Sequence, residues 1–274
     1  MNAVVTGHLG FIGCRLAQAL TLQGHKVYGI DKELIGNKDW QSTLRNFIFS
    51  TRPDVVFHVG ACSDTLEQNV NYMMNLNYES TKVIADYCKE HKIPMIYSSS
   101  AANYGINGKN PSNLYGWSKY CGEEYVLKSG GVALRYFNVY GPGEEHKGNM
   151  SSVAYQMFVK NLKNEDIFLF PKEPRRDFVY IKDVVLANMH AYENHELLQG
   201  KYYDVGSGRP ESFEKMLELM EIEYSYTDEK DIPEGYQFFT CSDKDKWLPG
   251  WFPQYTLEKG IKDYRQYLGE NLDV

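Results

Sequence analysis

The amino-acid sequence predicts an α/β protein with a doubly wound parallel sheet and a smaller carboxyl-terminal lobe. Three observations lead to this prediction. In the first half of the chain, short runs rich in β-branched residues alternate with longer segments whose apolar residues recur at helical intervals. A glycine-rich turn joins the first such run to the first helical segment. After about Gly141 the elements are shorter, and polar stretches separate them. Strands that alternate with helices form parallel βαβ units, which need helices on both faces of the sheet.

Each element of the first half is expected from its own composition. Strands are expected in AVVTG, KVYGID, PDVVFHVGA, IPMIYSSS and GVALRYFNVYG, which are residues 3–7, 26–31, 53–61, 93–100 and 131–141. Helices are expected where apolar residues recur every three or four positions, at residues 11–24, 73–91 and 114–130. The segment between the second and third strands is charged, and its pattern assigns no element to it. Together these elements predict one domain with a parallel sheet over residues 1–141.

Residues 142–274 are expected to form mainly a substrate-binding lobe. Two strand-like runs, FVYI (178–181) and KYYDV (201–205), each precede a helical pattern. We therefore expect segments between about 176 and 210 to return to the sheet of the first domain.

Composition narrows the classes of function. The 274 residues carry a formal net charge of −7, with both signs scattered and no basic stripe, so nucleic acid is not expected as a partner. No apolar run approaches the roughly 20 residues that span a bilayer, and MNAVVTGHLG lacks the basic start of a secretory signal. The five cysteines form no Cys-x-x-Cys pair, and the seven histidines lack metal-ligand spacing. These features predict a cytoplasmic protein with free thiols, without a metal site or a membrane partner.

The glycines Gly7, Gly10 and Gly13 lie directly between the first strand and the first helix. Glycines at this place let the backbone turn tightly and approach a pyrophosphate, which the amino end of the helix attracts. A bare turn would also use glycines, but the second strand ends in Asp31, 18 residues after Gly13. A carboxylate there can accept hydrogen bonds from an adenosine ribose, so the pattern predicts dinucleotide binding.

The choice between NAD and NADP stays open at this point. Asp31 would repel a ribose 2′-phosphate, which favours NAD. Lys32 and Lys38 could offset that repulsion, or they could form a solvated basic patch in a loop.

The spacing Tyr-x-x-x-Lys occurs five times in the chain, and only Tyr115 has a suitable context. It follows the serine run Ser98–Ser100, which should lie at the carboxyl edge of the sheet, where ligands of open α/β sheets bind. Tyr115 and Lys119 share a helix face, so the ammonium, together with an oxidised nicotinamide, should lower the phenol pKa from about 10. Tyr115 could then accept a proton from a sugar hydroxyl while hydride leaves the same carbon, and Ser100 could hydrogen-bond that oxygen. Glu123 and Glu124 are expected on the solvated face of the helix.

The glycine turn, the serine run and Tyr115-x-x-x-Lys119 together resemble the extended short-chain dehydrogenase/reductase family, which acts mostly on nucleotide sugars. The resemblance covers nearly the whole chain. Its closest form is similar to the ADP-glycero-manno-heptose 6-epimerases, through the stretches GACSDT, YMMNLNY, RYFNVYGPGEEHKGNM, RRDFVY and YQFFT. It implies a Rossmann-type fold, a bound NADP or NAD (NADP slightly favoured by the resemblance), a nucleotide-sugar substrate such as ADP-heptose, and a homo-oligomer.

The resemblance also implies roles for single residues. Tyr115 and Lys147 match two acid/base groups that serve opposite faces of a transient ketone at C6 of the heptose, with Lys119 and Ser100 in support. The residues that match substrate contacts are Ser100, Asn138, Arg176 and Tyr236. Beyond the glycines and the Tyr-Lys pair, the residues predicted to bind the cofactor are Phe11, Ile12, Asp31, Lys32, Lys38, Gly60, Ala61, Asn75 and Val139.

Read without the resemblance, Lys147 is an ordinary loop lysine, and Arg175-Arg176 beside Asp177 could be a surface ion-pair cluster. The chain is also shorter than the heptose epimerases between Tyr104 and Tyr115, close to the expected active site. Two alternatives therefore remain. One is a UDP- or GDP-sugar 4-epimerase, reductase or dehydratase of the same superfamily, and the other is a dinucleotide-binding module without catalysis.

Overall fold

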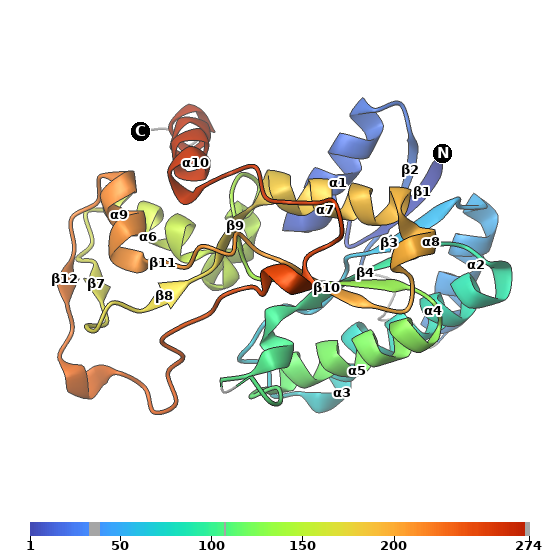
Figure 1. Ribbon diagram of the computed structural model, residues 1–274, viewed down its shortest axis with the longest axis horizontal. Coiled ribbons are helices and arrows are strands. Elements are labelled where there is room, and N and C mark those ends of the chain that lie inside the picture. Colours follow the sequence, from blue (N-terminus) through green and yellow to red (C-terminus); the bar gives the residue numbers. More distant parts are fainter. Residues whose placement is uncertain (33–38, 107, 272–274) are drawn as a thin grey trace. The chain divides into compact units, whose positions relative to one another are not determined.

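The computed structural model of the chain describes residues 1–32, 39–106 and 108–271 (Figure 1). The chain forms two compact units. The first unit contains Met1–Tyr136 and Val185–Asp204, and the second contains Phe137–Val184 and Val205–Val274. The expected boundary at residue 141 thus lies slightly beyond the end of the first segment, and residues 185–204 return to the first unit. The assignment of cofactor to one unit and substrate to the other stays a prediction.

A six-stranded sheet forms the centre of the first unit, as the sequence predicts. Its strand order is β10-β5-β4-β3-β1-β2, and the pairings from β2 to β5 are parallel. The strands are β1 (Asn2–Thr6), β2 (Lys26–Ile30), β3 (Val55–His58), β4 (Met95–Ser100), β5 (Val132–Tyr136) and β10 (Tyr202–Val205). Because β1 has β2 on one side and β3 on the other, the strand order reverses at β1, and ligands of open α/β sheets bind outside such a point.

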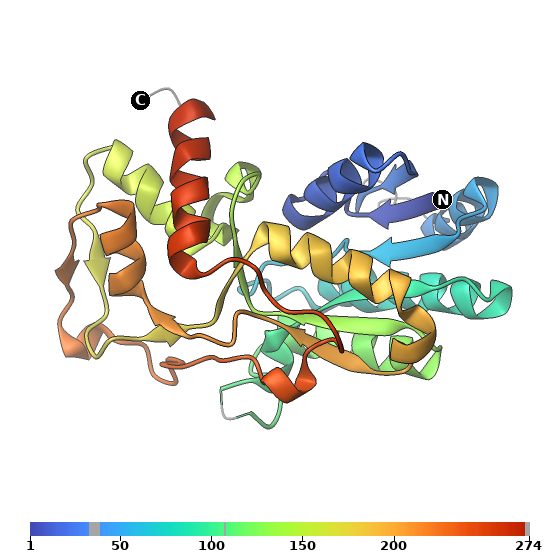
Figure 2. The same cartoon turned by 45° about the horizontal axis from the view of Figure 1, so that its top comes forward.

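Helices cover both faces of this sheet (Figures 1 and 2). One face carries α2 (Trp40–Thr51), α4 (Ser80–His91) and α5 (Leu114–Lys128), and the other carries α1 (Phe11–Leu22) and the residues of α7 (Ile181–Glu193) that belong to the first unit. Side chains alternate accordingly along the strands. Val56 packs in the cluster beneath α2 and α4, while the ring of its neighbour Phe57 contacts Tyr192 of α7 at 6.2 Å.

The structure differs from the expected elements in three places. The charged segment between the second and third strands, to which no element was assigned, contains α2, which buries Trp40, Leu44 and Ile48 at intervals of four residues. The strand expected over 131–141 divides at Phe137 into β5 and β6 (Asn138–Tyr140). The helix expected over 73–91 consists of α3 (Val70–Met74), a π-helical turn over Asn75–Glu79 and α4.

The second unit consists of short strands and four helices among its described residues. The strand pairs are β6 with β9 (Phe178–Tyr180), β8 (Arg175–Arg176) with β11 (Glu211–Ser212), and β7 (Phe168–Leu169) with β12 (Ser225–Tyr226). The run FVYI therefore pairs with β6, whereas KYYDV joins the main sheet. The helices are α6 (Val153–Leu162), the start of α7, α9 (Phe213–Met220) and α10 (Leu257–Asn271).

Buried tyrosines form the core between β6, β9 and α10. The ring of Tyr140 lies 5.3 Å from that of Tyr180 and 6.4 Å from that of Tyr264. A Cβ at Gly260 would lie 2.0 Å from the Tyr140 hydroxyl oxygen, so α10 can pack this closely only because the residue is glycine.

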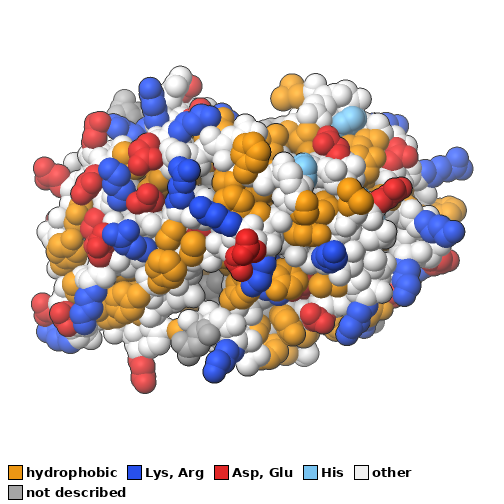
Figure 3. Space-filling model, in the orientation of Figure 1, with side chains coloured by type: hydrophobic (Ala, Val, Ile, Leu, Met, Phe, Trp, Pro, Cys, Tyr) orange, Lys and Arg blue, Asp and Glu red, His pale blue; other side chains and the backbone are white. Residues whose placement is uncertain are grey.

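Among the helices of the described residues, none combines the length and apolar composition needed to cross a membrane. On the face drawn in Figure 3, acidic and basic side chains are interspersed.

Candidate active site

The glycine turn of the first unit follows β1 and meets the end of β3. Gly7 has φ +66°, and a Cβ there would lie 2.6 Å from the Cα of Gly60. A Cβ at Gly13 would lie 2.1 Å from the carbonyl oxygen of Gly7, so α1 begins directly against the turn. Gly10 is the N-cap of α1 and provides no side-chain hydrogen bond. The positive end of the helix thus lies against a turn that has glycine at positions 7 and 10, which suits the pyrophosphate of a dinucleotide.

A buried histidine joins the carboxyl ends of β1 and β3. The N–H of Gly60 donates to Oγ1 of Thr6 (3.0 Å), which lies 2.7 Å from Nδ1 of His58. On the other side, Nε2 of His58 lies 2.8 Å from Oγ1 of Thr81, which donates to the carbonyl of Asn77. This order makes Nε2 the protonated nitrogen and the imidazole neutral. Burial, assisted by the charge of Lys119, lowers the pKa of His58 to about 3.

Asp31 directly follows β2 and contacts the glycine turn. One carboxylate oxygen accepts from the N–H of Leu9 at 3.1 Å, and the other accepts from the N–H of Lys32 at 2.7 Å. The carboxylate therefore lies beside the turn, at the place where a Rossmann-type site contacts an adenosine ribose. The Lys32 side chain is exposed, and Lys38 lies outside the described residues.

Ser100 and Tyr115 come together at the carboxyl end of β4. A hydrogen bond joins the Tyr115 phenol to the Ser100 side chain, and Oγ of Ser100 accepts from the N–H of Ala102 at 3.1 Å. Asn113 caps α5 by accepting from the N–H of Gly116 at 2.8 Å, which fixes the turn that carries Tyr115.

The lowered pKa of Tyr115 that the sequence predicts for the cofactor-bound state stays a prediction. Burial raises the pKa of the phenol, and its hydrogen bond with Ser100 only partly opposes this effect. Lys119 is 2% exposed, with Nζ 4.3 Å from the centre of the Tyr97 ring. Burial lowers the pKa of Lys119 to about 7, although the carboxylate of Glu123 raises it. The ammonium is thus itself destabilised, and burial has the largest effect on the pKa of the Tyr115 phenol. The positive nicotinamide ring of a bound oxidised cofactor would supply a lowering contribution.

Glu123 is not on the solvated face of α5, which corrects the sequence prediction. Its side chain is fully buried and forms an ion pair with Arg135 of β5, at 2.9 Å from Nε and 2.5 Å from Nη2. The helix presents Tyr115, Lys119 and Glu123 to the sheet at intervals of four residues. Glu124 is exposed, as expected.

In the second unit, Asn138 and Asp177 join three segments. The amide of Asn138 donates to the carbonyl of Asp177 and to Oγ1 of Thr240, both at 3.2 Å. The carboxylate of Asp177 accepts from the N–H groups of Ser207, Gly208 and Ser242 at 2.6, 3.0 and 2.7 Å. This fully buried aspartate was not predicted as part of the site, and it fixes the backbone next to Arg176.

Arg176 and Tyr236 lie together in the second unit, as the resemblance implies. The guanidinium carbon of Arg176 is 5.3 Å from the centre of the Tyr236 ring and 5.5 Å from that of Phe213. Burial lowers the pKa of Arg176, and a hydrogen bond with Tyr236 partly opposes this effect. Arg176 is therefore not part of a surface ion-pair cluster. Arg175, in contrast, is exposed and pairs with Glu173 at 2.6 Å.

Lys147 lies in the 3₁₀ segment Glu145–Met150 and is half-buried. Burial lowers its pKa, and the carboxylate of Glu144 opposes this effect. Glu144 is fully buried, and it accepts from the N–H of Gly141 and the hydroxyls of Ser152 and Tyr264. A loop held in this way keeps Lys147 partly desolvated, which favours a neutral amine and hence acid/base chemistry.

The other predicted cofactor residues occupy varied positions. Phe11 and Ile12 form the first turn of α1, with Phe11 buried. Ala61 is exposed after β3, Asn75 is exposed at the start of the π-helical turn, and Val139 lies in β6 of the second unit.

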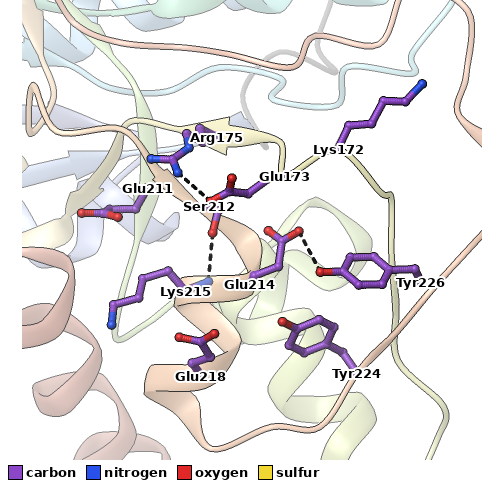
Figure 4. A pocket seen from close by; sticks show the side chains of 10 residues that line it. All are labelled: Lys172, Glu173, Arg175, Glu211, Ser212, Glu214, Lys215, Glu218, Tyr224 and Tyr226. Atoms are coloured by element: carbon purple, nitrogen blue, oxygen red, sulfur yellow. Dashed lines mark hydrogen bonds and ion pairs between the residues drawn. The ribbon is translucent and has the colours of Figure 1, made fainter. Parts of the chain in front are cut away.

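A pocket of about 600 Å³ on the second unit does not coincide with these residues (Figure 4). Four glutamates, three basic residues, Ser212 and two tyrosines line it. In Figure 4 the carboxylate of Glu214 points toward the Tyr226 hydroxyl, 3.5 Å away. None of the described residues that line this pocket is a predicted site residue.

Comparisons with known proteins give the family. The model of the NAD dependent epimerase/dehydratase family matches residues 3–206. ADP-L-glycero-D-manno-heptose-6-epimerase from Helicobacter pylori is 28% identical, with a TM-score of 0.86 over 97% of this chain and 96% of that chain. UDP-glucose 4-epimerase from Thermotoga maritima, solved with UDP-glucose, is 24% identical, with a TM-score of 0.86 and full coverage of both chains. UDP-glucuronic acid 4-epimerase from Bacillus cereus, solved with UDP-glucuronic acid and NAD, is 21% identical, with a TM-score of 0.82 over 98% of this chain and 99% of that one.

The last two similarities establish the fold alone, whereas the family match covers more than half of the chain. The predicted fold class and the predicted enzyme family are thus confirmed. The suggested preference for NADP has no support. The chain belongs to the NAD-dependent epimerase/dehydratase family.

Proposed function

We propose that this protein is a nucleotide-sugar epimerase that inverts C6 of an ADP-heptose through transient oxidation to a ketone. The observation that carries the proposal is the arrangement of Tyr115, hydrogen-bonded to Ser100, with Lys119 buried one turn further along α5. Similarity to the Helicobacter pylori heptose epimerase over nearly the whole of both chains supports the choice of sugar.

The first unit would hold the cofactor and the first acid/base group. NAD held by the glycine turn would supply the hydride chemistry that oxidises the sugar carbon and then reduces it on the opposite face. Tyr115 would remove the hydroxyl proton, with Ser100 hydrogen-bonded to the same oxygen. The protonated form of Lys119, whose pKa is about 7, would stabilise the phenolate of Tyr115.

NAD is the cofactor that the first unit suits best. The carboxylate of Asp31 lies against the glycine turn, where it would accept hydrogen bonds from a ribose 2′-hydroxyl and repel a 2′-phosphate. The family description, which names NAD, supports the same choice.

The second unit would supply the second acid/base group and bind the diphosphate. Epimerisation at C6 needs proton transfer on both sides of the ketone, and the lowered pKa of Lys147 suits the second group. The guanidinium of Arg176, which lies near the rings of Tyr236 and Phe213, would bind phosphate oxygens bidentately.

A second candidate is a UDP-sugar 4-epimerase, because the Thermotoga maritima UDP-glucose 4-epimerase matches the full chain with the same TM-score. A 4-epimerase that rotates its keto intermediate can use Tyr115 alone. The two candidates therefore differ in their need for Lys147.

Proton NMR of ADP-D-glycero-D-manno-heptose with the purified protein tests the proposal directly. The C6 epimer should accumulate, with or without added NAD if the cofactor stays bound. Tyr115→Phe should abolish turnover and retain NAD binding, while Tyr120→Phe on the same helix should behave as wild type. Lys147→Ala should also abolish turnover, with Lys163→Ala, an exposed lysine of the same unit, as its control.

The outcomes separate the candidates. No C6 epimer, together with conversion of a UDP-sugar by both wild type and Lys147→Ala, would select the 4-epimerase. No turnover of any nucleotide sugar, with NAD still bound, would point to the non-catalytic module.

A further inference from the structure

The carboxylate of Glu123 is buried one helical turn beyond Lys119 and has more partners than an ion pair requires. The Ser99 hydroxyl donates to Oε2 at 2.6 Å, and the Asn103 amide donates to the same oxygen at 3.1 Å. Arg135 binds both oxygens from β5. Three separate elements thus converge on one side chain of α5.

These partners lie on both sides of Ser100 in the chain. Ser99 precedes it, and Asn103 follows it in the 3₁₀ turn Ala101–Tyr104. The Asn103 amide also donates to Ser99 at 3.0 Å, so the two flanking residues are bonded to each other as well as to Glu123. The position of Ser100 relative to α5 is therefore fixed at both ends by the same carboxylate.

A second set of contacts holds the far end of this turn. The guanidinium of Arg135 lies between the rings of Tyr104 and Tyr202, at 4.5 and 3.6 Å from their centres. The Tyr104 hydroxyl donates to Asp204 at 2.8 Å. Arg135 is thus fixed by stacking as well as by charge, and it in turn fixes the orientation of Glu123.

We propose that Glu123 is a positioning residue for the reaction: it fixes the segment Ser99–Asn103 onto α5 and so holds the Ser100 hydroxyl against the phenol of Tyr115. This inference rests on the proposed role of Tyr115 as the base. A purely structural ion pair would need Arg135 alone, whereas Glu123 also binds Ser99 and Asn103, which lie on either side of Ser100 in the chain.

The test uses Glu123→Gln in the full chain, with Glu124→Gln, exposed on the same helix, as the matched control. The glutamine keeps the size of the side chain and removes its charge. We expect turnover to fall by about 10- to 100-fold, the loss typical of a small misplacement of a catalytic group, with NAD binding unchanged. The control should retain wild-type turnover.

The deciding readout does not depend on activity. The Cζ resonance of Tyr115 in ¹³C-tyrosine-labelled protein, assigned with Tyr115→Phe, reports the protonation of the phenol. Because the hydrogen bond with Ser100 lowers the pKa of Tyr115, Glu123→Gln should raise it. Ser99→Ala, which removes a single hydroxyl, should act in the same direction, and combining it with Glu123→Gln should add little.

An unchanged Tyr115 titration in folded Glu123→Gln would overturn the inference. If Glu123→Gln does not fold, an unchanged Tyr115 titration in Ser99→Ala would also overturn the inference. A shifted titration together with an active Tyr115→Phe would instead overturn the proposed function and leave the positioning contact intact.

Discussion

Replacing Lys119 by Met should stabilise the protein near neutral pH while removing activity. The side chain is 2% exposed, and its pKa is lowered from 10.5 to about 7 in the folded state, chiefly by burial. The groups that face it are Tyr97, His58 and Glu123. Folding must therefore either deprotonate this amine in part or bury its charge, and both cost free energy. A methionine carries no charge and avoids this cost.

The magnitude follows from the pKa difference. The drop in the pKa of Lys119 from 10.5 to about 7 corresponds to a loss of about 5 kcal/mol in folding free energy when the amine is protonated in both the folded and the unfolded state, at about 1.4 kcal/mol per pH unit. At pH 7 the amine is about half protonated in the folded state, and the loss of folding free energy is about 4 kcal/mol. At pH 10 this loss is less than about 1 kcal/mol. Between these values the unfolded chain binds more protons than the folded one, so the stability of the wild type should rise with pH across this window.

Urea unfolding of wild type and Lys119→Met, followed by circular dichroism between pH 7 and pH 10 without added cofactor, measures this difference. The urea midpoint of Lys119→Met should exceed that of the wild type at pH 7, and the difference should become smaller as pH rises. A constant difference, or a variant less stable than wild type at pH 7, would refute the claim that burial of the amine costs stability. Lys128→Met, at the exposed end of the same helix, is the control.

Three further predictions concern other residues. His58→Gln should reduce the loss of stability between pH 6.5 and pH 4. The histidine has a pKa of about 3 in the folded state, so it binds a proton on unfolding in this range. Acid unfolding followed by circular dichroism measures the difference between the variant and the wild type. Gly7→Ala should lower stability by about 1–3 kcal/mol and weaken NAD binding in calorimetry, because its Cβ would lie 2.6 Å from Gly60. Arg176→Lys should raise KM for the nucleotide sugar about tenfold with little change in kcat, because a lysine cannot bind phosphate bidentately.

The controls for these variants lie in the same chain. Gly24→Ala has a similarly positive φ of +80° but open space around it, so it should lose stability without weakening NAD binding. Arg175→Lys should leave KM unchanged because Arg175 pairs with Glu173 at the surface. Equal effects of Arg175→Lys and Arg176→Lys would contradict the assignment of the diphosphate site.

The sequence allowed prediction of the main sheet and the glycine turn because both depend on local patterns. Alternating strands and helices specify a parallel sheet, and glycines between the first strand and helix, followed by Asp31 after the second strand, are typical of a dinucleotide site. The helix α2 was missed because its buried stripe of Trp40, Leu44 and Ile48 is narrow and lies in a polar segment. A helix with so few apolar positions is stabilised by tertiary packing, which the local composition does not show.

The role of Glu123 was also missed, although two signals for it exist. It continues the spacing of Tyr115 and Lys119 by four residues, and Arg135 interrupts the apolar run GVALRYF. A charge inside a buried strand requires a partner, but the sequence does not say which acidic residue it is. The network around Asp177 leaves no such signal, since its partners are mostly backbone N–H groups 30 or more residues away.

The return of residues 185–204 to the first unit has a consequence for synthesis on the ribosome. When residues up to Tyr136 have emerged, β5 is an open edge of the sheet, because β10 is still missing. Arg135 at that stage lacks the ring of Tyr202, and Tyr104 lacks its acceptor Asp204. The first unit can therefore be completed only after the chain has begun the second, and until then β5 is an unpaired edge that could associate with other strands.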